Sequence, residues 1–152
     1  MRIGVISDTH GLIRPEALTA LAGSELIIHA GDVGDPAVLV KLRTIAPVIV
    51  VRGNIDKGDW ADRLPGYELV RREGASIYVI HDVSRLEVDP VAAGLQAVIS
   101  GHTHKPATRL QDGVLYLNPG SAGPRRFKLP VALALLDVSE KGLHAEHIHL
   151  VA

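Results

Sequence analysis

Residues 3–10 read Ile-Gly-Val-Ile-Ser-Asp-Thr-His, an apolar run followed at once by side chains that can bind a metal. Near-continuous apolarity over four or five residues is typical of a β-strand that is buried on both faces. We therefore expect a central strand here, with Asp8 and His10 just beyond its carboxyl end.

Four more runs rich in β-branched residues follow, at residues 26–28, 48–51, 77–80 and 97–99. Two segments with helix signals lie between the first three runs of the chain. One begins with Pro15 and ends before Gly23, and the other begins with Pro36 after Asp35, a residue type that caps helix N-termini. The first half therefore predicts an α/β fold with a largely parallel sheet.

The second half has the pattern of antiparallel hairpins, in which paired apolar segments flank short turns that contain glycine. The pairs are residues 67–72 with 76–80, 108–110 with 114–117, and 131–138 with 144–151. No linker, internal repeat or low-complexity tract interrupts the 152 residues. We expect a single domain over residues 1–152, parallel early and antiparallel late.

Composition limits the classes of function. The chain is 47% hydrophobic and 22% charged, with a formal net charge of -1, which argues against an extended nucleic-acid surface or a basic membrane-binding face. It has no cysteine, so disulfides and thiolate metal sites are excluded. Because no apolar stretch has the length of a membrane span and no leader segment is visible, we expect a cytoplasmic protein.

The polar residues that follow the apolar runs can all bind hard or borderline divalent cations. In chain order they are Asp8, His10, Asp32, Asn54, His81, His102 and His104. Ligands bind beyond the carboxyl ends of the strands in open α/β sheets, so we expect these side chains to meet at one edge. A single such residue is usually a turn residue, a helix cap or a surface histidine. Seven at equivalent points favour a metal centre, and they are too many for one tetrahedral ion.

The same residues, with their neighbours, resemble the motifs of the calcineurin-like metallophosphoesterases over residues 1 to about 126. The motifs are Asp8-Thr9-His10, Gly31-Asp32, Gly53-Asn54, His81 and Gly101-His102-Thr103-His104. Asn118-Pro119-Gly120-Ser121, followed by Arg125, resembles the small bacterial and archaeal phosphodiesterase branch, to which the scaffold subunit of retromer is also related. The resemblance implies a four-layer α-β-β-α sandwich of two mixed sheets packed face to face, with helices outside.

The resemblance also implies how the ligands are divided between two divalent metal ions. One ion would take Asp8, His10 and His104, the other Asn54, His81 and His102, and Asp32 would bridge both. Nitrogen and oxygen donors without sulfur suit manganese, iron, zinc or nickel better than calcium. We expect manganese, with magnesium also compatible. Catalysis is expected to rest on Asp32, Asn54 and His81, through attack of a metal-bridging hydroxide on a small phosphodiester.

One position departs from the family pattern. Many relatives carry a histidine directly after the asparagine of the Gly-Asn motif, where it can protonate the leaving oxygen. Here Ile55 stands at that position and cannot transfer a proton. Asp56 is the nearest replacement, although it can equally cap the following turn. We therefore expect a preference for good leaving groups, such as aryl diesters. Arg125 is a second candidate contact for substrate, with ordinary surface charge as its alternative role.

Other functions fit the sequence less well. A non-catalytic scaffold or binding module of the same fold would predict eroded ligands, whereas all seven positions hold competent side chains. A phosphatase with Asp8 as nucleophile would call for a second acid at position 10, where the chain has histidine. His29 can either orient a ligand or pack at a strand end. The natural substrate stays open, and a homo-oligomer is compatible with the sequence.

Overall fold

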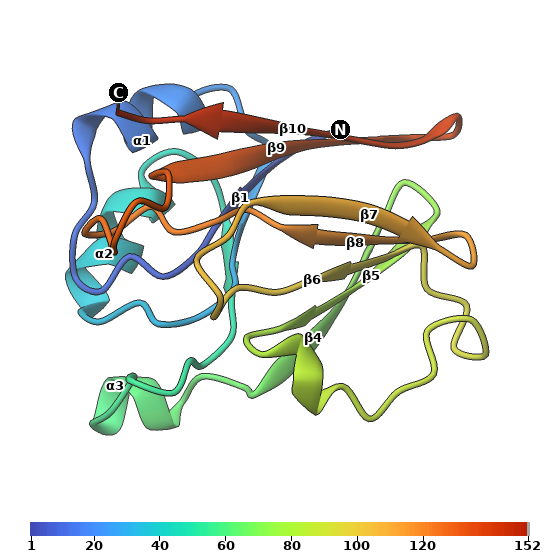
Figure 1. The fold of residues 1–152 in the computed structure, drawn as a ribbon, viewed down its shortest axis with the longest axis horizontal. Coiled ribbons are helices and arrows are strands. Elements are labelled where there is room, and N and C mark those ends of the chain that lie inside the picture. The colour runs from blue at the N-terminus through green and yellow to red at the C-terminus, as the bar shows by residue number, and fades with distance from the viewer. Residues whose placement is uncertain (152) are drawn as a thin grey trace.

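In the computed structural model, which describes residues 1–151, two mixed sheets of five strands pack face to face (Figure 1). Their orders are β10-β9-β1-β2-β3 and β4-β5-β6-β8-β7. The strands are β1 Arg2–Ile6, β2 Leu26–His29, β3 Val48–Val50, β4 Tyr67–Arg72, β5 Ala75–Ile80, β6 Ala97–Ile99, β7 Ala107–Gln111, β8 Val114–Asn118, β9 Ala132–Ser139 and β10 Gly142–His149. The expected sandwich of two mixed sheets is confirmed.

The first sheet is built around β1, as its apolar sequence predicts. β1 pairs in parallel with β2, and β2 pairs in parallel with β3, whereas β9 runs antiparallel to β1. Alternate side chains of β1 enter different cores. Ile3 and Val5 pack between the sheets, and Ile6 packs under the helices. All three are fully buried, so this strand is covered on both faces.

The second sheet corrects one expectation. The hairpins β4–β5 and β7–β8 form where the turns predict them, and both pairs are antiparallel. However, β5, β6 and β8 run parallel to one another, so the second half is mixed rather than antiparallel. Hairpin pairing is decided by the local turn, whereas the direction of β6 depends on the long connection from residue 81 to residue 96.

Helices cover the outer face of the first sheet. They are α1, Pro15–Leu21, and α2, Pro36–Arg43, and each has proline at its start. The predicted cap of α2 forms, because the Ala37 N–H donates to Asp35 Oδ1 at 2.8 Å. The outer face of the second sheet has a different cover. Within residues 1–151 it carries only the short 3-10 helix Val83–Arg85 and its loop, where the family fold implied α-helices; the remaining helix, α3, is the single turn Asp59–Asp62.

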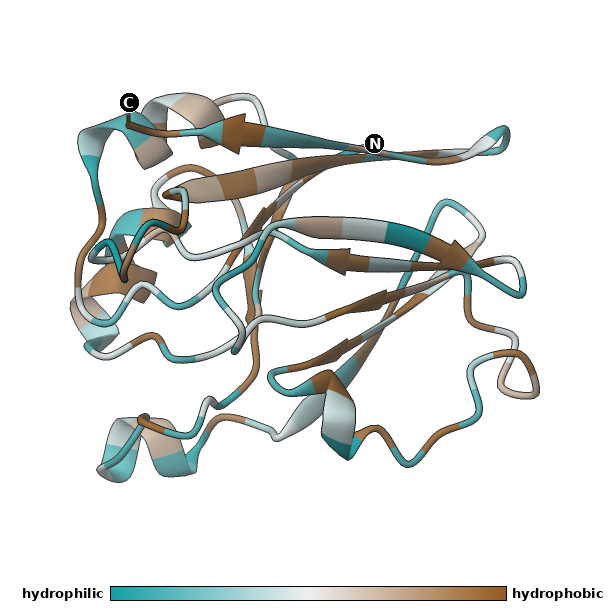
Figure 2. Cartoon of the chain, in the orientation of Figure 1, coloured by the Kyte–Doolittle hydropathy of each residue, from teal (hydrophilic) through white to brown (hydrophobic). Residues whose placement is uncertain are grey.

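The interior is divided by the first sheet into two large apolar cores. Figure 2 shows apolar residues along the strands of both sheets, with hydrophilic residues in the turns and connecting segments. The core between the sheets includes Ile28, Ile77, Ile99 and Leu136, and it holds the two layers together. Among residues 1–151, no helix has the length and apolarity that crossing a membrane would require.

A buried imidazole fastens two loops at the carboxyl edge of the first sheet. His29, the last residue of β2, is fully buried. Its Nδ1 accepts the Gly31 N–H at 3.1 Å, so Nε2 carries the proton and donates to Thr9 Oγ1 at 3.0 Å. The Thr9 hydroxyl in turn donates to the Val33 carbonyl at 2.8 Å. His29 therefore joins the loop after β1 to the loop after β2, through Thr9 and Gly31, which are neighbours of candidate ligands in the sequence.

Burial makes this link dependent on pH. It lowers the pKa of His29 to about 4, although the charges of Asp8, Asp56 and Asp32 partly oppose the shift. In the unfolded chain a histidine titrates near 6.5. The neutral ring thus stabilises the fold fully above about pH 6.5, and this contribution is lost progressively as the pH falls towards 4.

We predict that the free energy of unfolding of the metal-free protein falls by about 2 kcal/mol more between pH 7 and pH 5 than that of the His29→Gln variant. Gln lacks the titration but keeps a donor and an acceptor. Urea denaturation in the presence of EDTA measures both proteins at each pH. Equal pH dependence in the two proteins would show that His29 is not held neutral by the fold.

Candidate metal centre

The loops that follow β1, β2, β3, β5 and β6 supply the seven candidate ligands, and five of these residues have a left-handed backbone. The φ angles are 54° for Asp8, 47° for His10, 56° for Asp32, 73° for His102 and 64° for His104. A positive φ is unfavourable for residues other than glycine and persists only where surrounding contacts hold it. Backbone strain is thus concentrated at the strand ends that the sequence singled out.

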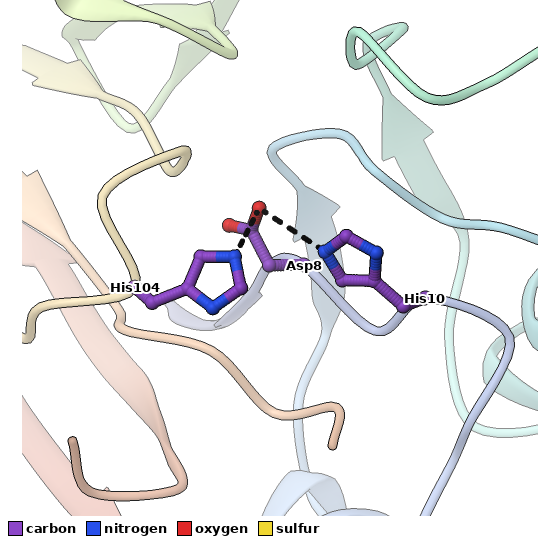
Figure 3. A group of neighbouring side chains, drawn as sticks. All are labelled: Asp8, His10 and His104. Atoms are coloured by element: carbon purple, nitrogen blue, oxygen red, sulfur yellow. Dashed lines mark ion pairs between the residues drawn. The ribbon is translucent and has the colours of Figure 1, made fainter. Parts of the chain in front are cut away.

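Asp8 lies at the middle of this group, and its two carboxylate oxygens have different surroundings. Oδ2 accepts hydrogen bonds from Ser7 Oγ at 2.7 Å and from the His102 N–H at 3.0 Å. Oδ1 is buried and has no hydrogen-bond partner. It lies 3.3 Å from His104 Nε2 and 3.9 Å from His10 Nε2, as the dashed lines in Figure 3 mark. A buried carboxylate oxygen without a partner is costly, and a bound cation would satisfy it.

A second group of side chains lies beside the first. Asp32 Oδ2 is 3.3 Å from His81 Nε2 and 3.7 Å from His10 Nε2. Asn54 Oδ1 is 3.0 Å from the same His81 nitrogen, and the His81 and His102 rings meet edge to face with centroids 5.3 Å apart. Asp32 therefore borders one member of each ligand set that the family resemblance implies.

His81 is oriented by the backbone. Its Nδ1 lies 2.7 Å from the carbonyl oxygen of Ala30, which can only accept, so Nδ1 carries a proton. In the neutral ring Nε2 then presents a lone pair towards the carboxylate of Asp32, which repels it unless a cation or a second proton intervenes. Burial opposes the charged ring, but the hydrogen bond that this ring donates to Asp32 and the charges of Asp8 and Asp32 outweigh it and raise the pKa of His81.

Asp32 shows the reciprocal effect. Burial alone would raise the pKa of its carboxyl group, but the hydrogen bonds from His81 and from the Ile55 N–H, together with the charges of His81 and His10, lower it. The metal-free site therefore holds Asp32 as an anion beside a ring that readily takes a proton. A divalent cation would replace that proton and compete with it.

Three glycines let the loops approach closely enough to form the group. A Cβ atom on Gly31 would lie 2.7 Å from His81 Nδ1. One on Gly53 would overlap the backbone nitrogen of Asp32, and one on Gly101 would overlap Ser7 Oγ. Because glycine has no Cβ atom, its presence directly before Asp32, Asn54 and His102 permits these close approaches.

The position of Asp56 argues against the expected substrate contact. Its side chain is 1% exposed, and its two oxygens accept three backbone N–H groups, those of Val33 at 3.2 Å, Gly34 at 2.9 Å and Gly53 at 2.9 Å. A carboxylate so enclosed joins the loop after β2 to the loop after β3 and cannot reach a leaving group. These contacts do not cap the following turn either, because the partners are Gly53, which precedes Asp56, and Val33 and Gly34 of another loop.

The other conspicuous side chains lie around the group. Arg125 lines a cavity of about 590 Å³ with His149 and Leu150, and its role as a substrate contact stays a prediction. Asp82 N-caps the 3-10 helix through Ser84 and lies 3.7 Å from His102 Nε2. It also borders a cavity of about 520 Å³ that Asn54, His81 and His102 line.

Two supporting residues were missed by reasoning from the sequence. Ser7 Oγ donates to Asp8 Oδ2, and Ser121 Oγ donates to the backbone carbonyl of Asp8 at 3.0 Å. Ser7 directly precedes the Asp8-Thr9-His10 motif and Ser121 ends the motif at residues 118–121, and this position is the one signal that could have indicated their supporting roles. Asn118, in the same motif as Ser121, donates to the Gly101 carbonyl and to Thr103 Oγ1, both at 3.0 Å. That motif therefore supports two of the loops that carry candidate ligands, the one after β1 and the one after β6.

The side chains fit a transition-metal site. Two sets of potential ligands have their donor atoms within 4.8 Å of one another: Asp8, His10 and His104, and Asp8, Asp32 and His81. The buried donor atoms without hydrogen bonds, Asp8 Oδ1 and His10 Nε2, belong to these sets. Imidazole and carboxylate donors suit manganese, iron, zinc or nickel.

Comparisons with known proteins show which family the chain resembles. A model of the family described as calcineurin-like phosphoesterase superfamily domain matches residues 1–141. A protein of Methanothermobacter thermautotrophicus named "Probable metallophosphoesterase" is 39% identical over 160 residues, covering 97% of this chain and 92% of the relative. The corresponding protein YsnB of Bacillus subtilis is 28% identical, covering 91% of this chain and 85% of the relative.

Solved structures show the same fold. One described as a novel archaeal phosphodiesterase has a TM-score of 0.80 at 24% identity, covering 97% of this chain and 100% of that one. Vps29 of Entamoeba histolytica, solved with zinc, has a TM-score of 0.75 at 23% identity, covering 99% and 100%. The chain therefore belongs to the calcineurin-like phosphoesterase superfamily, whose members are metal-dependent.

Proposed function

We propose that this protein is a hydrolase that uses two divalent metal ions to cleave small phosphodiesters. The observation that most supports this proposal is the buried Asp8 Oδ1, which has no hydrogen-bond partner and faces three imidazoles at 3.3 to 3.9 Å. The family match supports a metallophosphoesterase, and the description of one structural neighbour as an archaeal phosphodiesterase supports action on diesters.

Two ions account for the ligands better than one. The two sets of potential ligands share Asp8, and Asp32 lies within 4 Å of a histidine from each predicted set. Asn54 and His102 both lie beside His81, where a second ion would bind. A single tetrahedral ion would leave several of these side chains without a role. The donor types favour manganese, with iron, zinc, nickel and magnesium also compatible.

The bound cations would lower the pKa of a coordinated water to about 7 and neutralise charge that develops on the phosphate oxygens. The protein holds the side chains that would bind these cations in fixed orientations. The Ala30 carbonyl orients the His81 ring, the Ile55 N–H orients Asp32, and Ser7 orients Asp8. Because the two carboxylates offset only half the charge of two divalent ions, the site retains a net positive charge that attracts a phosphate anion.

Asp82 favours diesters over monoesters. Its pKa is lowered by the hydrogen bond from Ser84, with burial opposing the shift, so it is ionised at neutral pH. It borders the same cavity as Asn54 and His102. A carboxylate there repels a monoester dianion more strongly than a diester monoanion.

A scaffold without catalytic activity is the rival proposal, since Vps29 has this fold. A scaffold has no need of the strained backbone at five of the seven candidate ligands or of a buried carboxylate oxygen without a partner. Both features are costly to a fold and useful to a metal centre.

We predict that Asp32→Asn lowers hydrolysis of bis(p-nitrophenyl) phosphate with manganese by more than about 100-fold. Loss of an outer partner of a metal ligand already costs 10- to 100-fold, so loss of a ligand should cost more. Metal content by mass spectrometry should fall in parallel. Asp112→Asn is the matched control, because Asp112 is an exposed hairpin-turn residue whose φ of 52° asparagine adopts readily. Full activity in Asp32→Asn, or no activity in the unmodified protein, would refute the proposal.

We also predict a steep dependence on the leaving group, because Ile55 is 39% exposed at the position where many relatives carry the proton donor. For a series of aryl methyl phosphodiesters, kcat should fall steeply as the pKa of the phenol rises. Ile55→His should raise kcat for the poorest leaving groups by at least about tenfold, since a general acid contributes 10²- to 10⁴-fold. Ile55→Gln, which is polar but does not titrate near neutrality, controls for polarity. A flat dependence in the unmodified protein would mean that another residue donates the proton.

A further inference from the structure

We infer that a basic cavity beside the metal centre binds the ester group that stays on the phosphate after hydrolysis, and that this group is a nucleotide bearing a second phosphate. The inference rests on the proposed function and deepens it. The basic cavity has a volume of about 850 Å³ and is lined by Thr103, Lys105, Arg126, Phe127, Lys128 and Leu129. This volume lies in the range of small-molecule sites.

Two residues that line the basic cavity are neighbours of candidate ligands in the sequence. Thr103 stands between His102 and His104, and Lys105 follows His104 directly. The cavity that Asp82 borders lies instead against Asn54, His81 and His102. In the proposed binding mode the phosphorus of a diester lies at the metal centre and one ester group lies in each cavity.

The charges that line the basic cavity are all positive. Lys105, Arg126 and Lys128 are exposed, and no acidic residue is among the lining residues. The whole chain has a formal net charge of -1, so this concentration is local. Lysine and arginine together bind phosphate oxygens through charge-assisted hydrogen bonds. The complementary ligand is an anion beyond the phosphate that is cleaved.

Phe127 gives the basic cavity an aromatic face. Its side chain is 88% exposed, so burial does not explain a phenylalanine at this position. Its φ of 54° is one of eight positive values at residues other than glycine within residues 1–151; five belong to candidate ligands and two, Glu73 and Asp112, to hairpin turns. Phe127 is therefore strained without being a candidate ligand or a hairpin residue. An exposed ring among cations is the arrangement on which nucleic-acid bases stack.

The walls of the basic cavity are fastened to the metal centre. On one side, the Ala122 N–H donates to the Ser7 carbonyl at 3.1 Å, and Arg14 donates to the Gly123 carbonyl at 3.2 Å. On the other side, Thr103 Oγ1 accepts from Asn118 Nδ2 at 3.0 Å and from the Lys105 N–H at 3.2 Å. The loop that carries Phe127 is thus held at its base against the Ser7–Asp8 segment. A ligand group on Phe127 and a phosphorus at the metal centre belong to one molecule.

The test uses three diesters that share one leaving group, p-nitrophenolate: the methyl ester, the thymidine 5′ ester, and the thymidine 5′ ester with a 3′-phosphate. In each reaction a water oxygen bonds to phosphorus, the bond from phosphorus to the aryl oxygen breaks, nitrophenolate leaves with the electron pair, and a proton passes to solvent. Differences in kcat/KM therefore report only on the retained group.

The unmodified protein with manganese should prefer the thymidine ester to the methyl ester, and the 3′-phosphorylated ester to both. Phe127→Ala should reduce the preference for thymidine over methyl by on the order of tenfold, the effect of losing a stacked base. Phe127→Trp should restore it. Arg126→Gln combined with Lys128→Gln should remove the further preference for the 3′-phosphate. Leu110→Ala and Lys141→Gln, exposed residues of distant hairpins, should leave every ratio as it is.

Each other outcome is decisive. Turnover of all three esters with ratios that Phe127→Ala does not change would overturn the inference and leave the proposed function standing. No turnover of any ester would overturn both. If Phe127→Ala instead changes the oligomeric state in gel filtration, or abolishes binding to phosphatidylglycerol vesicles, the loop serves a subunit or membrane contact and the inference is wrong.

Discussion

The carboxylate of Asp8 is the constraint on which the rest of the site depends. It is fully buried just beyond the end of the central strand. Oδ2 is satisfied by Ser7 and by the backbone of His102, which brings the loop after β6 onto the end of β1. Oδ1 is left facing three imidazoles. A positive charge beside that oxygen, from a cation or a protonated ring, would offset the cost of burying it.

The first sheet and the polar edge could be predicted from sequence because both follow from local periodicity. Apolar runs such as residues 3–6 identify buried strands, and a glycine before Asp32 or His102 indicates where the chain must leave the sheet sharply. The parallel course of β6 could not be predicted, because strand direction depends on where a long connection returns. The role of Asp56 was equally hidden, since its partners Val33 and Gly34 belong to another loop.

The basic cavity illustrates a second limit of sequence reasoning. Phe127 and the charged residues around it read as ordinary surface in a chain without a basic stripe. Their possible role becomes visible only in the fold, because hydrogen bonds of Ser121 and Ala122 hold the base of that loop against the strand end that carries Asp8. Sequence can identify the candidate metal ligands, since they follow strands. It is less informative about residues that select the substrate, since these lie on loops whose positions depend on tertiary contacts.

The principal ligands divide their polar atoms between the fold and the metal centre. Asp8 uses Oδ2 for Ser7 and the His102 backbone, Asp32 uses Oδ1 for the Ile55 N–H, and His81 uses Nδ1 for the Ala30 carbonyl. In each case the remaining atom, Oδ1, Oδ2 or Nε2, points into the group. Asp56 is the contrast, with both oxygens committed to backbone N–H groups. The structural half of each ligand maintains the sandwich, so the chemical half can be altered with little effect on the fold.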